Sequence, residues 1–275
     1  MKLNFYSSNF EDQDLERITF LHGLAGTGKL WRPIIAGLDK DFAIMAMDQR
    51  GHGESRTIPG DEPEFSPLQF GKDVVETLKT NGFHPTWLVG HSMGVRSACA
   101  AAHLSPELIK GLILIDLGLA GPAGGGLNQN LSAFLSILPA SFASREQART
   151  FMANSPDPGI GQYLLATAET SATSEISFPF SRKALLATLQ AAHGVDLRPW
   201  IMQYSQKKRP VLILRGEKSK VWTHEEFETE KARFQSFSSV QFVEIAGAGH
   251  GLPFEKRVEF TALLRQLIAN YKNQT

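Results

Sequence analysis

Six short runs of consecutive apolar residues recur along the chain, and each is followed by a glycine-containing turn or a helical pattern. Continuous apolar character, rather than alternation of apolar and polar residues, is typical of strands covered on both faces. Strands that alternate with helices indicate an α/β fold with a mostly parallel sheet and helices on both faces. The six runs are RITFLHG, FAIMAMD, TWLVGHS, GLILIDLG, PVLILRG and VQFVEIAG.

The helices between these runs carry their own start and stop signals. Ser66 followed by Pro67 predicts an N-cap and the first helical position, and Gly82 predicts the end of that helix. Thr223 and Glu226 have the spacing of a capping box. These signals support the strand–helix alternation.

Residues 119–194 break this alternation. The segment opens with the glycine-rich stretch AGPAGGG and continues with amphipathic helical patterns. We expect an α/β core made of residues 1–118 and 195–275, with residues 119–194 forming a helical cap over the carboxyl edge of the sheet. A long helical crossover packed on the sheet is the alternative. Four apolar side chains of the segment predict either a largely apolar pocket or cap-to-core packing: Phe134, Leu135, Leu138 and Phe142.

The stretch LVGHSMGVRSACAAA carries the strongest chemical signal. It predicts a strand, then the turn Gly90-His91-Ser92-Met93-Gly94, then a helix. In a G-x-S-x-G turn of this kind the small flanking residues let the backbones approach, and the serine hydroxyl is lifted above the sheet. The N-terminus of the following helix favours developing negative charge nearby. Ser92 is therefore the candidate nucleophile.

A serine hydroxyl needs a base near neutral pH, and the chain has 8 histidines. His250 lies late in the chain, in the glycine-rich loop that follows the last apolar run. His91 is adjacent to Ser92, which favours a structural role. His250 is the candidate base.

Four motifs in order resemble those of the α/β-hydrolase family, in its small esterase-like branch with a helical cap. They are FLHGLAGTG, MDQRGHGES, GHSMG and AGAGH. The resemblance implies an oxyanion hole formed by the backbone amides of Leu24 and Met93. It also implies that MDQRGHGES is a structural loop near the site. Serine at position 92, where some branches carry aspartate, argues against dehalogenase and epoxide hydrolase chemistry.

The third member of the expected Ser–acid–His triad is not where most relatives of this family carry it. That position follows the strand ending at Gly216, and here it holds Ser219 and Lys220. Three alternatives remain: Asp116 at the end of the run LILID, Glu217 directly after Gly216, or a Ser92–His250 dyad without an acid. We favour Asp116, because its strand is expected to neighbour the strand ending at Gly216.

Composition restricts the partners. The formal net charge is zero, with 28 basic and 28 acidic residues, which does not favour a nucleic-acid or membrane partner. The single cysteine, Cys99, lies in an alanine-rich helical pattern and predicts a buried, inert thiol in a reducing compartment. No signal peptide or membrane span is indicated, so a cytoplasmic location is expected. The sequence calls for no cofactor and no metal.

A competing pattern occurs in GLAGTGK, Gly23 to Lys29, which matches the first seven positions of a phosphate-binding P-loop. Leu30 then replaces the serine or threonine that would bind magnesium. The chain is therefore predicted to be a serine hydrolase that cleaves small, largely apolar carboxylic esters through an acyl-enzyme. A non-catalytic or weakly catalytic ligand-binding member of the same fold is the alternative, and a nucleotide binder is a remote one.

Overall fold

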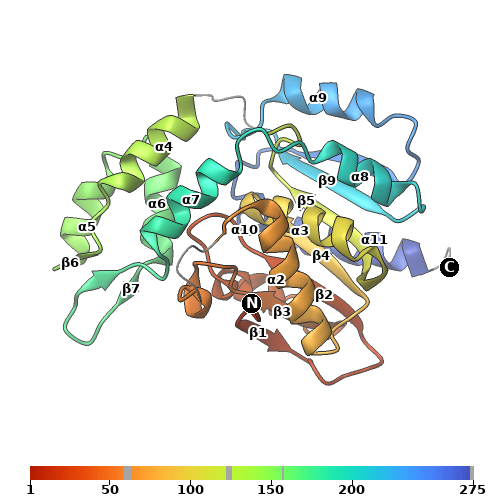
Figure 1. Cartoon of the computed structure of the whole chain (residues 1–275), viewed down its shortest axis with the longest axis horizontal. Coiled ribbons are helices and arrows are strands. Elements are labelled where there is room, and N and C mark those ends of the chain that lie inside the picture. The colour runs from red at the N-terminus through yellow and green to blue at the C-terminus, as the bar shows by residue number, and fades with distance from the viewer. Residues whose placement is uncertain (59–63, 122–125, 157, 273–275) are drawn as a thin grey trace.

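The computed structural model describes residues 1–58, 64–121, 126–156 and 158–272. A seven-stranded sheet with the order β1-β3-β2-β4-β5-β9-β10 forms its centre (Figure 1). Every neighbouring pair is parallel except β1 and β3. The strands are β1 (Phe5–Ser8), β2 (Glu16–Leu21), β3 (Phe42–Met47), β4 (Thr86–His91), β5 (Ile109–Ile115), β9 (Val211–Gly216) and β10 (Val240–Ile245).

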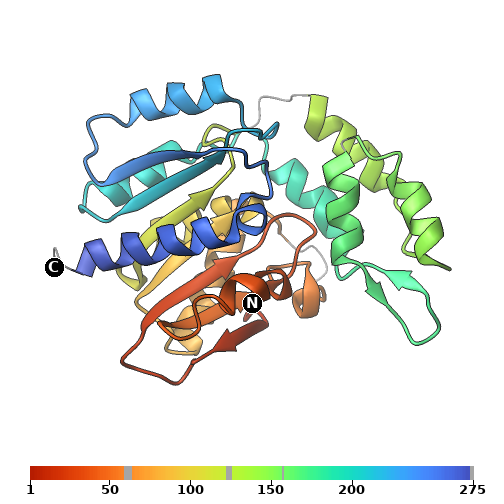
Figure 2. The same ribbon diagram turned by 180° about the vertical axis from the view of Figure 1, so that it is seen from behind.

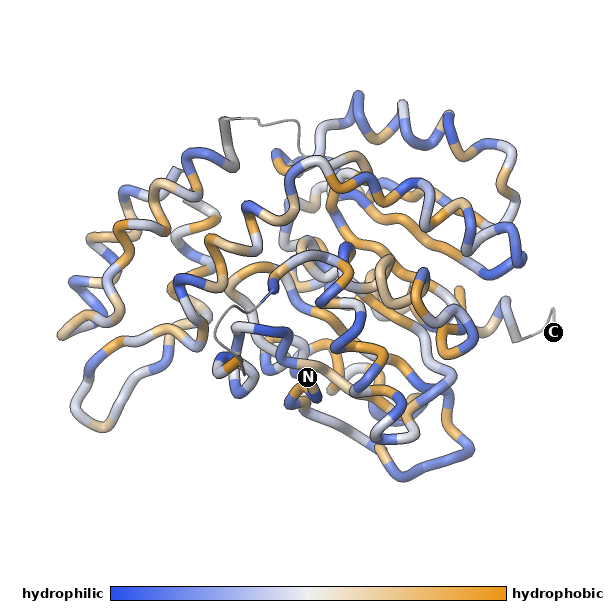
Figure 3. The backbone as a smooth tube through the Cα atoms, viewed as in Figure 1, coloured by the Kyte–Doolittle hydropathy of each residue, from blue (hydrophilic) through white to orange (hydrophobic). Residues whose placement is uncertain are grey.

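Each of the six apolar runs contains one parallel strand of this sheet, and Figure 3 shows the apolar character of these strands. The interior strands are buried along nearly their whole length, as expected for a sheet covered on both faces. The short antiparallel edge strand β1 was not predicted, because its sequence FYSS is half polar and only partly buried.

Helices cover both faces of the sheet (Figures 1 and 2). One face carries α2 (Pro67–Thr80), α3 (Met93–Leu104), α8 (Arg198–Ser205) and α9 (His224–Arg233), which share a hydrophobic cluster with the strands. The other carries α1 (Arg32–Ile35), α10 (Leu252–Glu255) and α11 (Arg257–Lys272), with a second cluster. Three 3₁₀ turns complete the core: η1 (Gly28–Trp31), η2 (Gly53–Ser55) and η3 (Pro106–Leu108). The fold class is thus the α/β arrangement that the sequence predicts.

The helix signals are confirmed. The Ser66 hydroxyl accepts a hydrogen bond from the Gln69 amide at the start of α2. The capping box of α9 is complete, since Thr223 and Glu226 bond to each other's backbone amides. No helix among the described residues combines the length and apolar character needed to cross a membrane.

The segment between β5 and α8 contains the elements of a helical insert, which lies beside the sheet in Figure 1. It packs around a hydrophobic cluster that also includes Ala25 of the core, and its small antiparallel sheet has the order β6-β8-β7. Two-residue strands leave no readable period, which is why this sheet was not predicted. Residues 122–125 of the glycine-rich stretch lie outside the described residues. The elements are α4 (Gly126–Ser136), β6 (Ser141–Phe142), α5 (Arg145–Met152), α6 (Pro158–Thr167), β7 (Glu169–Thr170), β8 (Ile176–Ser177) and α7 (Arg182–Ala191).

The carboxyl ends of three adjacent strands prepare the site. In the register of β4, β5 and β9, His91 lies beside Ile115, and Ile115 lies beside Leu214. The residues that leave these strands, Ser92 and Asp116, therefore emerge next to each other, beside the loop after Gly216. His250 follows β10, the strand next to β9.

Candidate active site

Ser92 forms the tight turn between β4 and α3. Its backbone has φ 52° and ψ −119°, a conformation that L-residues rarely adopt. Two glycines make the turn possible. A Cβ on Gly90 would lie 2.4 Å from the Gly94 carbonyl oxygen, and one on Gly94 would lie 2.3 Å from that of Leu21. The Ser92 amide donates to the Ile115 carbonyl at 2.9 Å, which ties the turn to β5.

Ser92, His250 and Asp116 form a continuous chain of hydrogen bonds. Ser92 Oγ lies 3.1 Å from His250 Nε2, and His250 Nδ1 lies 2.7 Å from Asp116 Oδ2. A carboxylate only accepts hydrogen bonds, so Nδ1 carries the proton and the lone pair of Nε2 faces the serine hydroxyl. The Asp116 side chain is fully buried, whereas 35% of the His250 side chain is exposed. The imidazole can therefore exchange protons with an incoming molecule.

Asp116 is held on both carboxylate oxygens. Oδ1 accepts from the Gly216 amide at 3.0 Å, and Oδ2 accepts from the Ser219 hydroxyl at 2.5 Å in addition to His250. Three donors therefore converge on this buried carboxylate. Sequence reasoning missed the contribution of Ser219, since a serine in the place of an acid indicated only that the acid was absent.

The structure brings Asp116, and not Glu217, to the imidazole. The Glu217 carboxylate instead accepts from the Gly247 amide at 2.7 Å, on the exposed side of the loop. A dyad without an acid does not describe this arrangement either, because a carboxylate contacts His250 Nδ1. Of the three alternatives, the geometry favours Asp116.

The loop after β2 approaches the serine from the other side. A Cβ on Gly23 would lie 3.2 Å from Ser92 Cβ, so the Leu24 segment passes directly over the elbow. Met93, the first residue of α3, follows Ser92. Among the described residues, the backbone amides of Leu24 and Met93 have no protein acceptor. Both are thus free to donate to a ligand near Ser92.

Two buried histidines hold this loop. His22 Nε2 accepts from the Gln49 amide, so its Nδ1–H donates to the Gly23 carbonyl at 2.8 Å. His52 Nε2 accepts from the Ala25 amide at 3.1 Å. Burial lowers the pKa of His22 to about 4, and burial together with the neighbouring His22 lowers the pKa of His52 to about 3. Both rings are neutral at pH 7, so Nε2 of each ring keeps the lone pair that accepts the backbone hydrogen bond. Their place after strand ends, in FLHG and RGHG, is the sequence signal for this role.

His91 supports the loop that carries His250, the candidate base. Its Nε2 donates to the His250 carbonyl at 2.8 Å, and the two ring centroids lie 4.9 Å apart. Burial, reinforced by the nearby His250 imidazole, lowers the pKa of His91 to about 3. A neutral His91 fixes the loop that carries His250, in agreement with the structural role expected for it.

The P-loop-like segment does not form a phosphate cradle. The Gly28 amide already donates to the Asp48 carboxylate at 2.7 Å, and Lys29 reaches toward Glu169, with Nζ 3.5 Å from Oε1. A short 3₁₀ turn, Gly28–Trp31, follows instead of a full helix N-terminus. The Gly28 amide and the Lys29 ammonium, which would contact a phosphate in a P-loop, are therefore already paired with acidic side chains.

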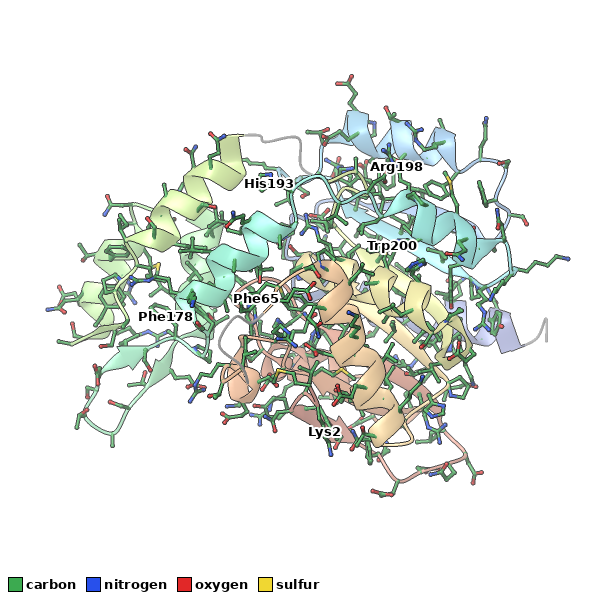
Figure 4. All side chains as sticks on the ribbon, in the orientation of Figure 1. Lys2, Phe65, Phe178, His193, Arg198 and Trp200 are labelled. Atoms are coloured by element: carbon green, nitrogen blue, oxygen red, sulfur yellow. The ribbon has the colours of Figure 1, made fainter. Side chains whose placement is uncertain are left out.

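The four apolar side chains proposed as pocket lining take part in packing between the insert and the core. These residues are buried in a cluster that also includes Ala25 of the core and contacts Leu24, so cap-to-core packing describes them better: Phe134, Leu135, Leu138 and Phe142. A separate cluster, which we call the elbow cluster, lies between core and insert. Figure 4 shows Phe65, one of its members, at this boundary. Its buried members are Phe65, Phe70, Met93 and Ala184, with Leu24, Ile58 and Ala187 packed against them.

The single thiol of the chain, Cys99, takes no part in the contacts of this site. Cys99 is free and buried in α3, and desolvation raises the pKa of its thiol. Within the described ranges, no group of three or more His, Cys, Asp or Glu side chains is arranged to hold a metal ion.

A family model described as the alpha/beta hydrolase fold matches residues 16–257 of the chain. That match includes the Ser92 turn, Asp116 and the His250 loop. It extends over far more than half of the chain, including the insert between β5 and α8.

Individual relatives are distant. Over 211 residues the chain is 28% identical to 2-(acetamidomethylene)succinate hydrolase of Mesorhizobium japonicum, covering 74% of this chain and 70% of that protein. Over 269 residues it is 25% identical to sn-1-specific diacylglycerol lipase ABHD11 of Mus musculus, covering 94% and 82%. Among solved structures, a marine microorganism esterase superposes with a TM-score of 0.78 at 22% identity, covering 97% of this chain and 99% of the other. At that identity the likeness establishes the fold.

Proposed function

This chain belongs to the alpha/beta hydrolase family, and from that premise we propose that it is a serine hydrolase that cleaves carboxylic esters through an acyl-enzyme. Three of the matched relatives carry hydrolase, lipase and esterase names, which supports hydrolase activity. One observation carries the finer proposal: the hydrogen-bond chain from Ser92 Oγ through the His250 imidazole to the Asp116 carboxylate.

In the proposed acylation step, Ser92 Oγ attacks the ester carbonyl carbon while His250 Nε2 takes the hydroxyl proton. The carbonyl oxygen becomes an oxyanion that accepts from the Leu24 and Met93 amides, and Asp116 stabilises the imidazolium. When the intermediate collapses, the bond to the alcohol oxygen breaks and His250 returns its proton to the leaving alkoxide. The products are a free alcohol and an ester on Ser92.

In the proposed deacylation step, the same imidazole serves water. His250 Nε2 takes a proton from a water molecule, whose oxygen attacks the acyl carbon. Collapse expels Ser92 Oγ, which recovers its proton from His250, and the carboxylic acid leaves. The partial exposure of the His250 side chain supports access of water to the imidazole. Asp116, on the other side of the ring, is completely buried.

We further propose that residues 119–194 act as the cap of the core formed by residues 1–118 and 195–275. Backbone bonds join the insert to the loop beside the site, from the Gly53 amide to the Pro179 carbonyl and from the Ser181 amide to the Gly51 carbonyl. The elbow cluster supports a small, largely apolar acyl group as substrate, because it adjoins both candidate oxyanion residues.

A fluorophosphonate probe tests the nucleophile and a panel of p-nitrophenyl esters of increasing acyl length tests the substrate class. We expect labelling of the wild-type chain, no labelling of Ser92→Ala, and turnover that is highest for short acyl chains. Loss of labelling in the wild type would favour the non-catalytic ligand-binding alternative. Labelling without ester turnover would keep the nucleophile and reject the ester.

A further inference from the structure

We propose that Ser219 is a positioning residue that fixes the Asp116 carboxylate and thereby sets the tautomer and basicity of His250. The inference rests on the serine hydrolase function proposed above. Ser219 stands where most relatives of the family are expected to carry the acid itself. Its side chain nonetheless reaches the same carboxylate–imidazole pair, as a donor rather than as an acceptor.

The direction of the Ser219 hydroxyl is determined by its neighbours. Its oxygen accepts from the Val221 amide at 3.2 Å, and its nearest acceptor is Asp116 Oδ2 at 2.5 Å. A carboxylate offers no proton, so the hydroxyl hydrogen points to Asp116. Ser219 and His250 therefore donate to one and the same oxygen, which ties its position to both loops.

The loop that carries Ser219 is built to hold it in place. The Ser219 amide donates to the Gly216 carbonyl at 2.9 Å, and the Lys218 amide donates to the Ala248 carbonyl at 2.8 Å. The buried Arg215 guanidinium donates to the carbonyls of Ser219 at 3.2 Å and Trp222 at 2.8 Å. Ser219 is itself buried, with 7% of its surface exposed. A side chain held this firmly does not need to reorganise during turnover.

Removing the hydroxyl changes the charge that His250 senses. The Ser219 donor withdraws part of the negative charge from Oδ2, and without it the carboxylate stabilises the imidazolium more strongly. The pKa of His250 is then expected to rise. The other titratable and charged groups on the elements around this pair are His91, Arg215, Glu217, Lys218, Lys220 and Glu255. Substitution at position 219 removes none of these charged groups. A change in the pKa of His250 therefore reports on the lost hydroxyl donor.

The experiment compares Ser219→Ala with Ser219→Thr, which keeps a hydroxyl, and with the matched control Ser205→Ala. Ser205 is also a buried serine that donates a hydrogen bond, to the Met202 carbonyl at 2.9 Å, but it lies on α8. The readout is the pKa of the His250 imidazole from an NMR titration, with its resonances assigned by their loss in His250→Gln. Ester turnover is measured alongside.

We expect Ser219→Ala to raise the pKa of His250 by about half a unit or more and to lower kcat on the order of tenfold, with KM unchanged. Ser219→Thr should recover most of both effects, and Ser205→Ala should show neither. An unchanged His250 pKa in Ser219→Ala, or an equal shift in Ser205→Ala, overturns the proposal. If Ser219→Ala does not fold, Ser219→Cys must shift the pKa in the same direction, because its thiol is a weaker donor.

The titration and the activity assay separate two kinds of failure. Absence of fluorophosphonate labelling in the wild type counts against the serine hydrolase function, whatever the titration shows. The His250 pKa reports on the Ser219 contact even in a chain without turnover, so an unshifted pKa in a chain that is labelled rejects the positioning role alone.

Discussion

His250 Nδ1 lies 2.7 Å from Asp116 Oδ2, although 134 positions separate the two residues in the chain. Asp116 emerges from β5 and His250 from the loop after β10, and β9 lies between those two strands. The Gly216 amide, at the end of β9, holds the second carboxylate oxygen of Asp116. The middle strand thus orients a carboxylate toward an imidazole that comes from the strand beyond it.

Asp116→Asn is expected to lower turnover on the order of a thousandfold or more. The Gly216 amide requires an acceptor at Oδ1, so the new NH₂ group would face His250 Nδ1. Nδ1 would then have to accept, and the proton would move to Nε2, where it opposes proton transfer from Ser92. An ester-hydrolysis assay of the purified variant measures the loss.

Glu217→Gln is the matched control. It removes a carboxylate from the loop after β9, and that carboxylate does not contact the His250 imidazole. The Glu217 carboxylate accepts a hydrogen bond from the Gly247 amide, and a glutamine oxygen can replace it there. Turnover within a few fold of wild type is expected. Equal and mild losses in both variants would contradict a triad with Asp116 as its acid.

Ser92→Gly is expected to be more stable than Ser92→Ala by about 1 kcal/mol, and both variants are expected to be inactive. The φ of 52° and ψ of −119° cost an L-residue about 1–3 kcal/mol, which glycine avoids. The greater conformational freedom of glycine in the unfolded chain offsets about 0.5–1 kcal/mol of this gain in stability. Both variants lose the hydroxyl, so the comparison isolates the backbone. Midpoints of urea unfolding measure it, and a glycine variant less stable than the alanine variant would show that the turn is not strained.

The sheet could be predicted from the sequence because each parallel strand is a continuous apolar run that ends at a turn. The edge strand β1 and the two-residue strands β6, β7 and β8 escaped prediction, because short or half-exposed strands leave no such run. The division into core and cap stays a prediction.

The candidate site was predictable residue by residue for Ser92 and His250, whose motifs are local. The contact with Asp116 was not determined by any motif, since it depends on the register of β5 and β9, which brings Ile115 beside Leu214. The contact of Ser219 with Asp116 could not be predicted from the sequence, because it depends on the direction of one hydroxyl group. The catalytic roles of these residues stay predictions that the variants above test.

The chain is expected to lose stability steeply below about pH 6.5, because three buried histidines stay neutral in the fold. The pKa values of His22, His52 and His91 are lowered to about 4, 3 and 3. Between pH 6.5 and about 4 the unfolded chain therefore binds protons that the folded chain does not, so the free energy of unfolding falls as the pH falls. Each histidine contributes about 1.4 kcal/mol per pH unit, about 4 kcal/mol for the three. Urea unfolding at several pH values measures this slope. His91→Gln should reduce it by one histidine's share, whereas exchange of the exposed His193 should leave it unchanged; an undiminished slope in His91→Gln would contradict the assignment.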